Sequence, residues 1–167
     1  MFLVPSANHQ YQTFPYLILL TLVSILIGYL RRQYLLYLAL IFTNISILYW
    51  GINHYQRPLL QITETYLIAF FVLYNIGFCL RSIFKKEKFN EFGILAQLLN
   101  AIFYFGPTYQ MLQLDYPLWP GYIAIILIFY YLAHSYLVYM PHKEDILLTW
   151  NLVGMGSLFA IIAIPIL

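Results

Sequence analysis

Long apolar runs alternate with short polar breaks along the whole chain. Each run approaches the roughly 20 residues that a helix needs to cross the hydrocarbon core of a bilayer. Helices satisfy their own backbone hydrogen bonds in lipid, so they are the natural structure for such runs. The pattern predicts an all-α integral membrane bundle of six transmembrane helices in one domain. The expected spans are residues 14–30, 34–50, 64–80, 92–112, 121–140 and 146–167.

The first two expected spans are short for a bilayer. Tyr16, Tyr49 and Trp50 lie near their ends, where aromatic side chains are enriched at membrane–water interfaces. We therefore expect these three residues to complete the crossings. Only a brief polar break separates the two spans, which predicts a tight helical hairpin.

The basic residues predict the orientation. Seven of the eight Lys and Arg residues fall in the breaks after the first, third and fifth spans, namely Arg31, Arg32, Arg81, Lys85, Lys86, Lys88 and Lys143. Only Arg57 lies elsewhere. Basic residues near span ends are retained on the cytoplasmic side. Both termini are therefore expected on the non-cytoplasmic side.

Composition excludes the main alternatives. Hydrophobic residues make up 63% of the chain and charged residues 8%, and the mean hydropathy is +0.78. A soluble domain carries about 25% charged residues. Residues 122–131 are apolar on every face, which disagrees with the alternating strands of a β-barrel. A net charge of +2 gives no argument for nucleic acid, and the single cysteine, Cys79, excludes an intrachain disulfide.

Several short motifs from the third span onward resemble a family of large, multi-pass bacterial membrane proteins of unknown function. They occur in a fixed order over roughly residues 60–167, and no single one is specific. They are Glu64-Thr65-Tyr66-Leu67 with Phe70-Phe71-Val72-Leu73-Tyr74, Leu99-Asn100-Ala101 with Phe103-Tyr104-Phe105-Gly106 and Tyr109, residues 124–132 with Tyr130-Tyr131, and Gly156-Ser157-Leu158-Phe159 with Ala163-Ile164-Pro165-Ile166-Leu167.

The resemblance implies a place in a bacterial cytoplasmic membrane, with the lipid bilayer as partner. It brings no accepted reaction and no assigned site. Members of that family are usually much longer and continue past the Ile-Pro segment, whereas this sequence stops at Leu167. A fragment, a truncated gene and a short paralogue all agree with this. Other membrane subunits, or the rest of a longer chain, are then the expected protein partners.

The fourth span carries the most unusual polar pattern. Gln97, Asn100, Tyr104 and Thr108 are spaced three and four residues apart, so they share one helix face. Polar side chains are unfavourable in lipid without partners, so this face should point into the bundle. It serves either interhelical hydrogen bonding or the lining of a substrate or ion path. Pro107 removes one backbone donor and favours a kink.

His134 and Glu64 complete the candidate polar site, because ionisable residues inside a membrane are functional candidates. His134 lies within the fifth span, and a structural pair with Asn100 or Tyr104 is the simpler interpretation. Glu64 opens the third span, where a carboxylate in the first turn would suit the helix dipole. If the two converge on one cavity, they become acid/base candidates.

Other intramembrane polar and small residues predict helix packing. Asn44, Asn75 and Asn151 are interpreted as interhelical hydrogen-bonding groups, and Gly154 with Ser157 as a face for close helix approach. The four histidines have no metal-ligand spacing and no phosphate-binding loop is present, so no metal or cofactor is expected.

Two functions remain open. The leading hypothesis is a non-enzymatic component of a larger membrane assembly or a transport-like bundle. The alternative is a membrane-embedded enzyme acting on a lipid, with His134 and Glu64 exchanging the proton.

Overall fold

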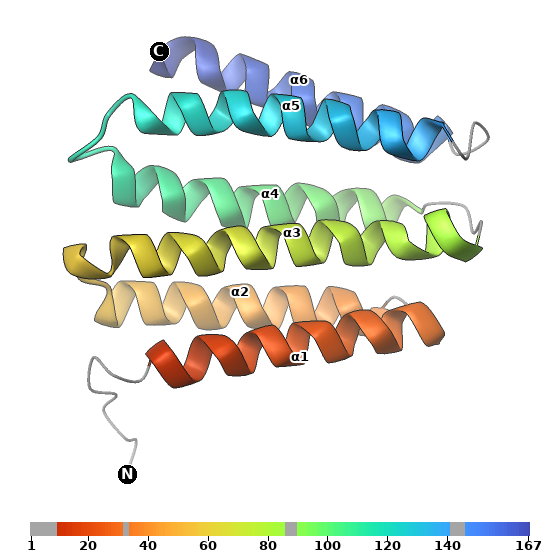
Figure 1. Cartoon of the computed structure of the whole chain (residues 1–167), viewed down its shortest axis with the longest axis horizontal. Coiled ribbons are helices and arrows are strands. Elements are labelled where there is room, and N and C mark those ends of the chain that lie inside the picture. The colour runs from red at the N-terminus through yellow and green to blue at the C-terminus, as the bar shows by residue number, and fades with distance from the viewer. Residues whose placement is uncertain (1–9, 32–33, 86–89, 141–145) are drawn as a thin grey trace. The chain divides into compact units, whose positions relative to one another are not determined.

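The computed structural model describes residues 10–31, 34–85, 90–140 and 146–167. Within these ranges the regular structure is entirely helical, and there is no strand. The elements, in chain order, are α1 (Gln10–Leu30), α2 (Tyr34–His54), the 3-10 helix η2 (Arg57–Leu59), α3 (Leu60–Lys85), α4 (Glu91–Leu112), α5 (Trp119–Tyr139) and α6 (Ile146–Ile166) (Figure 1). The predicted fold class, all-α, is confirmed for this part of the chain.

Helix boundaries follow local chemistry. The 3-10 helix η2 has a proline in its first turn, where a missing N–H costs nothing. The side chain of Asn90 caps α4 by accepting a 2.8 Å hydrogen bond from the backbone N–H of Gly93. Helix α1 already begins at Gln10, and α2 continues to His54, so each helix has 21 residues. Each is about 31 Å long at 1.5 Å per residue and needs no interfacial residues to complete a crossing.

Five of the six helices in the described ranges are long and apolar enough to cross a membrane. The corresponding segments are Thr13–Leu30, Tyr34–Asn53, Arg57–Lys85, Trp119–Tyr139 and Ile146–Ile166. Helix α4 is not among them. Its length suffices, but Gln97, Asn100 and the Gly106–Pro107 pair lower its hydropathy.

Contacts within the chain define two compact units that meet between Phe78 and Cys79, inside α3. In the N-terminal unit, α1 and α2 are antiparallel. The rings of Phe14 and Trp50 pack edge to face at 4.9 Å. At the other end of the pair, a Cβ on Gly28 would lie 3.3 Å from that of Leu36, so glycine permits the close approach.

Helix α3 runs parallel to α1 in the same unit. Phe14 contacts Tyr66 at 4.9 Å between ring centroids, and Gly77 lies against Ile25 near the other end. The expectation of three interfacial aromatic residues needs one correction. Tyr16 and Tyr49 are exposed, but Trp50 is only 7% exposed because it packs inward on Phe14.

In the C-terminal unit, α5 and α6 form an antiparallel pair. The hydroxyl of Ser135 donates to the carbonyl of Thr149 at 3.3 Å, and Gly156 lies against Ile128 and Leu132. Helix α4 packs along both α5 and α6. It is parallel to α6, because Gln97 meets Asn151 and Phe105 meets Phe159.

The expected small-residue face of α6 is wrong. Gly154 and Ser157 are exposed, and a Cβ on Gly154 would meet nothing within 4 Å. The glycine that admits α5 is Gly156, whose Cβ would lie 3.5 Å from Leu132. Both glycines occur in the same turn of an apolar helix, so sequence spacing alone could not choose between them.

Candidate functional site

The polar face predicted for α4 is buried. Gln97 and Thr108 are fully buried, and Asn100 and Tyr104 nearly so. All four have interaction partners. The helix continues unbroken through Pro107 from Glu91 to Leu112. The spacing of three and four residues therefore located a buried polar stripe correctly.

Gln97 joins three helices of the C-terminal unit. Its side-chain N–H donates to Sγ of Cys79 at 3.3 Å, and its carbonyl oxygen accepts from the side-chain amide of Asn151. We call Cys79, Gln97 and Asn151 the Gln97 junction. It links the end of α3 to α4 and α6. Both ends of the Gln97 amide are satisfied, as an apolar environment requires.

His134 does not have the arrangement predicted for it. Its Nδ1 atom is buried and has no hydrogen-bond partner among the described residues, so the expected bond to Asn100 or Tyr104 is absent at this atom. The imidazole ring instead packs edge to face against Tyr130, one turn earlier in α5, at 5.8 Å between centroids. The side chain is half-buried and flanks the buried stripe of α5.

Glu64 also differs from its prediction. Helix α3 begins at Leu60, four residues earlier than the expected span, so Glu64 is beyond the first turn and that turn holds no acidic residue. The helix-dipole effect is confined to the terminal turn, so it does not explain a carboxylate here. Glu64 is half-buried and has an interaction partner. It belongs to the N-terminal unit, whereas the other five candidate residues belong to the C-terminal unit.

A second polar group lies in the N-terminal unit, where no candidate site was expected. The hydroxyl of Tyr74 in α3 lies 3.2 Å from Oγ1 of Thr21 in α1 and 2.9 Å from Oγ1 of Thr43 in α2. All three residues are fully buried. We call Thr21, Thr43 and Tyr74 the Tyr74 node. It joins all three helices of its unit through hydroxyl groups.

The hydroxyl of Thr21 is the donor in two contacts at the Tyr74 node. The hydroxyl of Thr21 also reaches the carbonyl of Leu17 at 2.9 Å. Because a hydroxyl carries one hydrogen, the hydrogen of Thr21 is shared between the Tyr74 hydroxyl and the Leu17 carbonyl. In the contact between Thr43 and Tyr74, either hydroxyl can donate. The sequence signal was available, since all three hydroxyls are mid-span, but threonine is common in helices and the signal is weak.

Two of the three asparagines expected to join helices bond within their own helix. The side-chain amides of Asn44 and Asn75 donate to the carbonyls of Leu40 and Phe71, one turn earlier. Of these three asparagines, Asn151 bonds to another helix, through Gln97 of α4. The side-chain oxygen of Asn75 is buried without a hydrogen-bond partner in the part of the chain that is described.

Over the described ranges, no group of three His, Cys, Asp or Glu side chains could hold a metal ion. Comparison of the chain with protein-family models, with curated proteins and with solved structures gave no match.

Proposed function

We propose that this chain is a polytopic integral membrane protein with six transmembrane helices. Its role would be non-enzymatic, as a component of a larger membrane assembly or as a transport-like bundle. The resemblance noted in the sequence adds the expectation of a bacterial cytoplasmic membrane.

The observation that carries the proposal is the separation of apolar and polar side chains. Large apolar residues cover the outside of the helices, including Ile126, Phe129, Leu137, Ile161 and Ile164. The Tyr74 node is buried, and the Gln97 junction is buried except for the half-buried Asn151. Each uses its polar atoms to join helices. An apolar exterior around the hydrogen-bonded groups of the node and the junction is what a bilayer favours.

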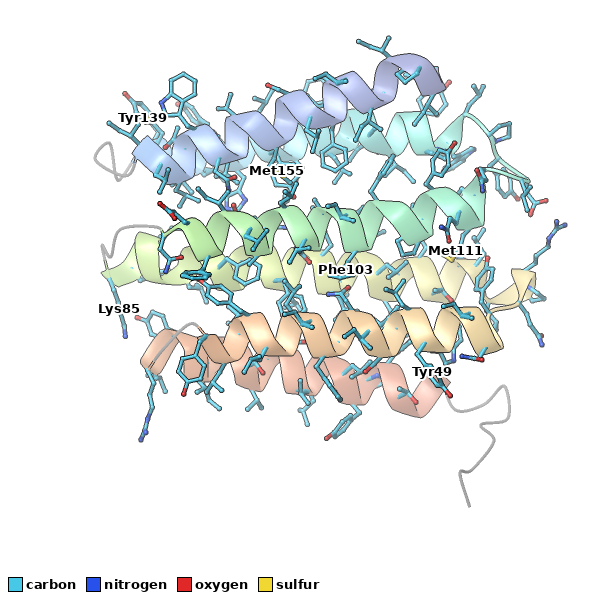
Figure 2. All side chains as sticks on the ribbon, turned by 180° about the vertical axis from the view of Figure 1, so that it is seen from behind. Tyr49, Lys85, Phe103, Met111, Tyr139 and Met155 are labelled. Carbon is cyan, nitrogen blue, oxygen red and sulfur yellow. The ribbon has the colours of Figure 1, made fainter. Side chains whose placement is uncertain are left out.

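The packing of α4 supports a sixth span. Two contacts, Gln97 with Asn151 and Phe105 with Phe159, pair residues of α4 and α6 at the same separation of 54 positions. The two helices therefore run in the same direction and in register. In the C-terminal unit, Lys85 and Tyr139 lie at one end, and Met111 of α4 lies at the other (Figure 2). If α6 crosses the membrane, α4 crosses beside it, and its polar face is tolerated because it is buried.

Extraction tests membrane integration. Membranes of expressing cells would be washed at alkaline pH, and the chain is expected to remain in the pellet until detergent is added. Release into the wash would contradict an integral protein. Native electrophoresis in mild detergent then separates the two roles. A species far larger than the detergent-bound 19.7 kDa chain supports an assembly.

Cysteine labelling tests the crossing of α4. Lys85→Cys and Gln113→Cys would each be made in the Cys79→Ser background, which keeps an oxygen acceptor for Gln97. Both positions are exposed. An impermeant maleimide added to intact cells is expected to label position 113 but not position 85. Labelling of both positions, or of neither, before permeabilisation would exclude a transmembrane α4.

A further inference from the structure

The helix directions are the same in the two units, although the most closely packed pair is α1–α2 in the first and α5–α6 in the second. Each contains three long helices, and in each the first and third helices run parallel. In the N-terminal unit, Phe14–Tyr66, Thr21–Tyr74 and Ile25–Gly77 join α1 to α3 at separations of 52, 53 and 52 positions. In the C-terminal unit, the α4–α6 contacts have separations of 54. The second helix is antiparallel to the third in both units.

Each unit also has one central aromatic residue in its third helix that contacts both other helices. Tyr74 contacts Thr21 and Thr43. Phe159 contacts Phe105 of α4 at 5.5 Å and stacks on Tyr131 of α5 at 5.9 Å. Thr21 of α1 therefore corresponds to Phe105 of α4, 84 residues later. Thr43 of α2 corresponds to Tyr131 of α5, 88 residues later, and Tyr74 of α3 corresponds to Phe159 of α6, 85 residues later.

Displacements of 85 and 88 residues align buried positions of the third and the second helices, respectively. The buried residues of α6 are Leu148, Leu152, Met155, Gly156, Phe159 and Ala163. Exactly 85 positions earlier in α3 are Thr63, Leu67, Phe70, Phe71, Tyr74 and Phe78, and all of these are buried. In α2, Leu36, Ala39, Thr43, Ile47 and Trp50 are buried, and the residues 88 positions later, Ala124, Leu127, Tyr131, Ser135 and Val138, are buried in α5.

We infer that the chain contains two copies of one three-helix module, residues 10–78 and 91–166. The inference rests on the six-span topology proposed above. Three crossings are an odd number, so the first helix of one module enters the membrane from the side opposite to that of the other. Inverted repeats of this kind form many secondary transporters. Between the two proposed roles, the repeat favours a transport-like bundle that moves a solute across the membrane.

The module relation predicts a contact that can be tested by cross-linking. Gly28 of α1 lies against Leu36 of α2. The displacements of 84 and 88 residues transfer this pair to Leu112 of α4 and Ala124 of α5, which are both buried. Two double variants, Gly28→Cys/Leu36→Cys and Leu112→Cys/Ala124→Cys, would be made in full-length Cys79→Ser protein. A third, Leu112→Cys/Ile126→Cys, is the control because Ile126 is 64% exposed.

The readout is the number of thiols that react with maleimide-linked polyethylene glycol after oxidation of isolated membranes. The Gly28–Leu36 and Leu112–Ala124 cysteine pairs are expected to form disulfides, so neither thiol of a pair reacts and both gel shifts are lost. The Leu112–Ile126 control is expected to stay reduced and to keep both gel shifts. If the first pair cross-links and the Leu112–Ala124 pair stays reduced, the modules are not equivalent. Cross-linking of the control pair to the same extent would also overturn the inference. Either result leaves membrane integration and the α4 labelling test unaffected, so failure of the two proposals can be told apart.

Discussion

Tyr74 is the residue whose polar atom does most to join helices in the N-terminal unit. Tyr74→Phe keeps the ring and its stacking on Phe78 but removes the hydroxyl that both threonines reach. A hydrogen bond inside a membrane contributes about 0.6 to 2 kcal/mol. We expect the free energy of unfolding in detergent micelles to fall by about this amount. Tyr16→Phe is the matched control, since Tyr16 is exposed, and equal stability of the two variants would contradict the role of the node.

Gln97 and Asn151 should be energetically coupled across α4 and α6. Replacing either residue by Leu leaves the amide of the other without this hydrogen bond. Replacing both residues removes both amides, so no unpaired amide of this pair is left. A double-mutant cycle on unfolding free energies should therefore give a coupling of about 0.6 to 2 kcal/mol. Gln97 with Asn44 provides the control cycle, because Asn44 bonds within its own helix. A Gln97–Asn151 coupling no larger than that of the control would contradict the junction.

At the scale of single helices, Gly156 and Gly154 form a matched pair. A Cβ on Gly156 would already contact Leu132 at 3.5 Å, so Gly156→Leu must push α5 and α6 apart. Overpacking of this kind costs about 1 to 3 kcal/mol. Gly154→Leu adds a side chain to open space and should leave the unfolding midpoint nearly unchanged. Equal loss of stability in both variants would show that the α5–α6 contact is not the cause.

Hydropathy predicted the elements well because a bilayer selects long apolar helices. Five expected spans correspond to helices that are apolar enough to cross, and the sixth corresponds to α4. The larger errors came from local chemistry. The 3-10 helix η2, which contains Pro58, leads directly into α3 at Leu60. Glu64 therefore lies beyond the first turn of α3, and the helix-dipole interpretation no longer applies. Sequence also gave no means of seeing that Trp50 turns inward onto Phe14.

The candidate site was predicted only in part, because sequence spacing reports on one helix and not on contacts between helices. Spacing along one helix identified the buried stripe of α4, because helical periodicity is local. The partners of that stripe lie on other helices, and sequence does not encode which helix faces which. Pairing by depth therefore suggested His134 for Asn100, whereas the recorded bond joins Gln97 to Asn151. The proposed repeat is not visible in the sequence either, since its central positions differ in residue type.

For the whole molecule, the basic residues between α3 and α4 are expected to hold that hairpin in the cytoplasm. Lys86 and Lys88 lie outside the described residues, as do Arg32 and Lys143, so this expectation rests on their charge alone. A basic residue near an anionic membrane surface contributes about 1 kcal/mol. Replacing Lys85, Lys86 and Lys88 by Gln therefore removes about 3 kcal/mol of the free energy that favours the cytoplasmic position of this hairpin.

The reporter for this change is Gln113→Cys, at the opposite end of α4. With the lysines present, an impermeant maleimide should label this position in all molecules, because the proposed topology places the end of α4 outside the cell. In the triple Gln variant, some hairpins should insert the other way, so the labelled fraction should fall. Arg57→Gln removes the one basic residue expected on the non-cytoplasmic side and should not lower labelling. An unchanged labelled fraction in the triple variant would mean that basic residues elsewhere, such as Arg31 and Arg32, set the orientation alone.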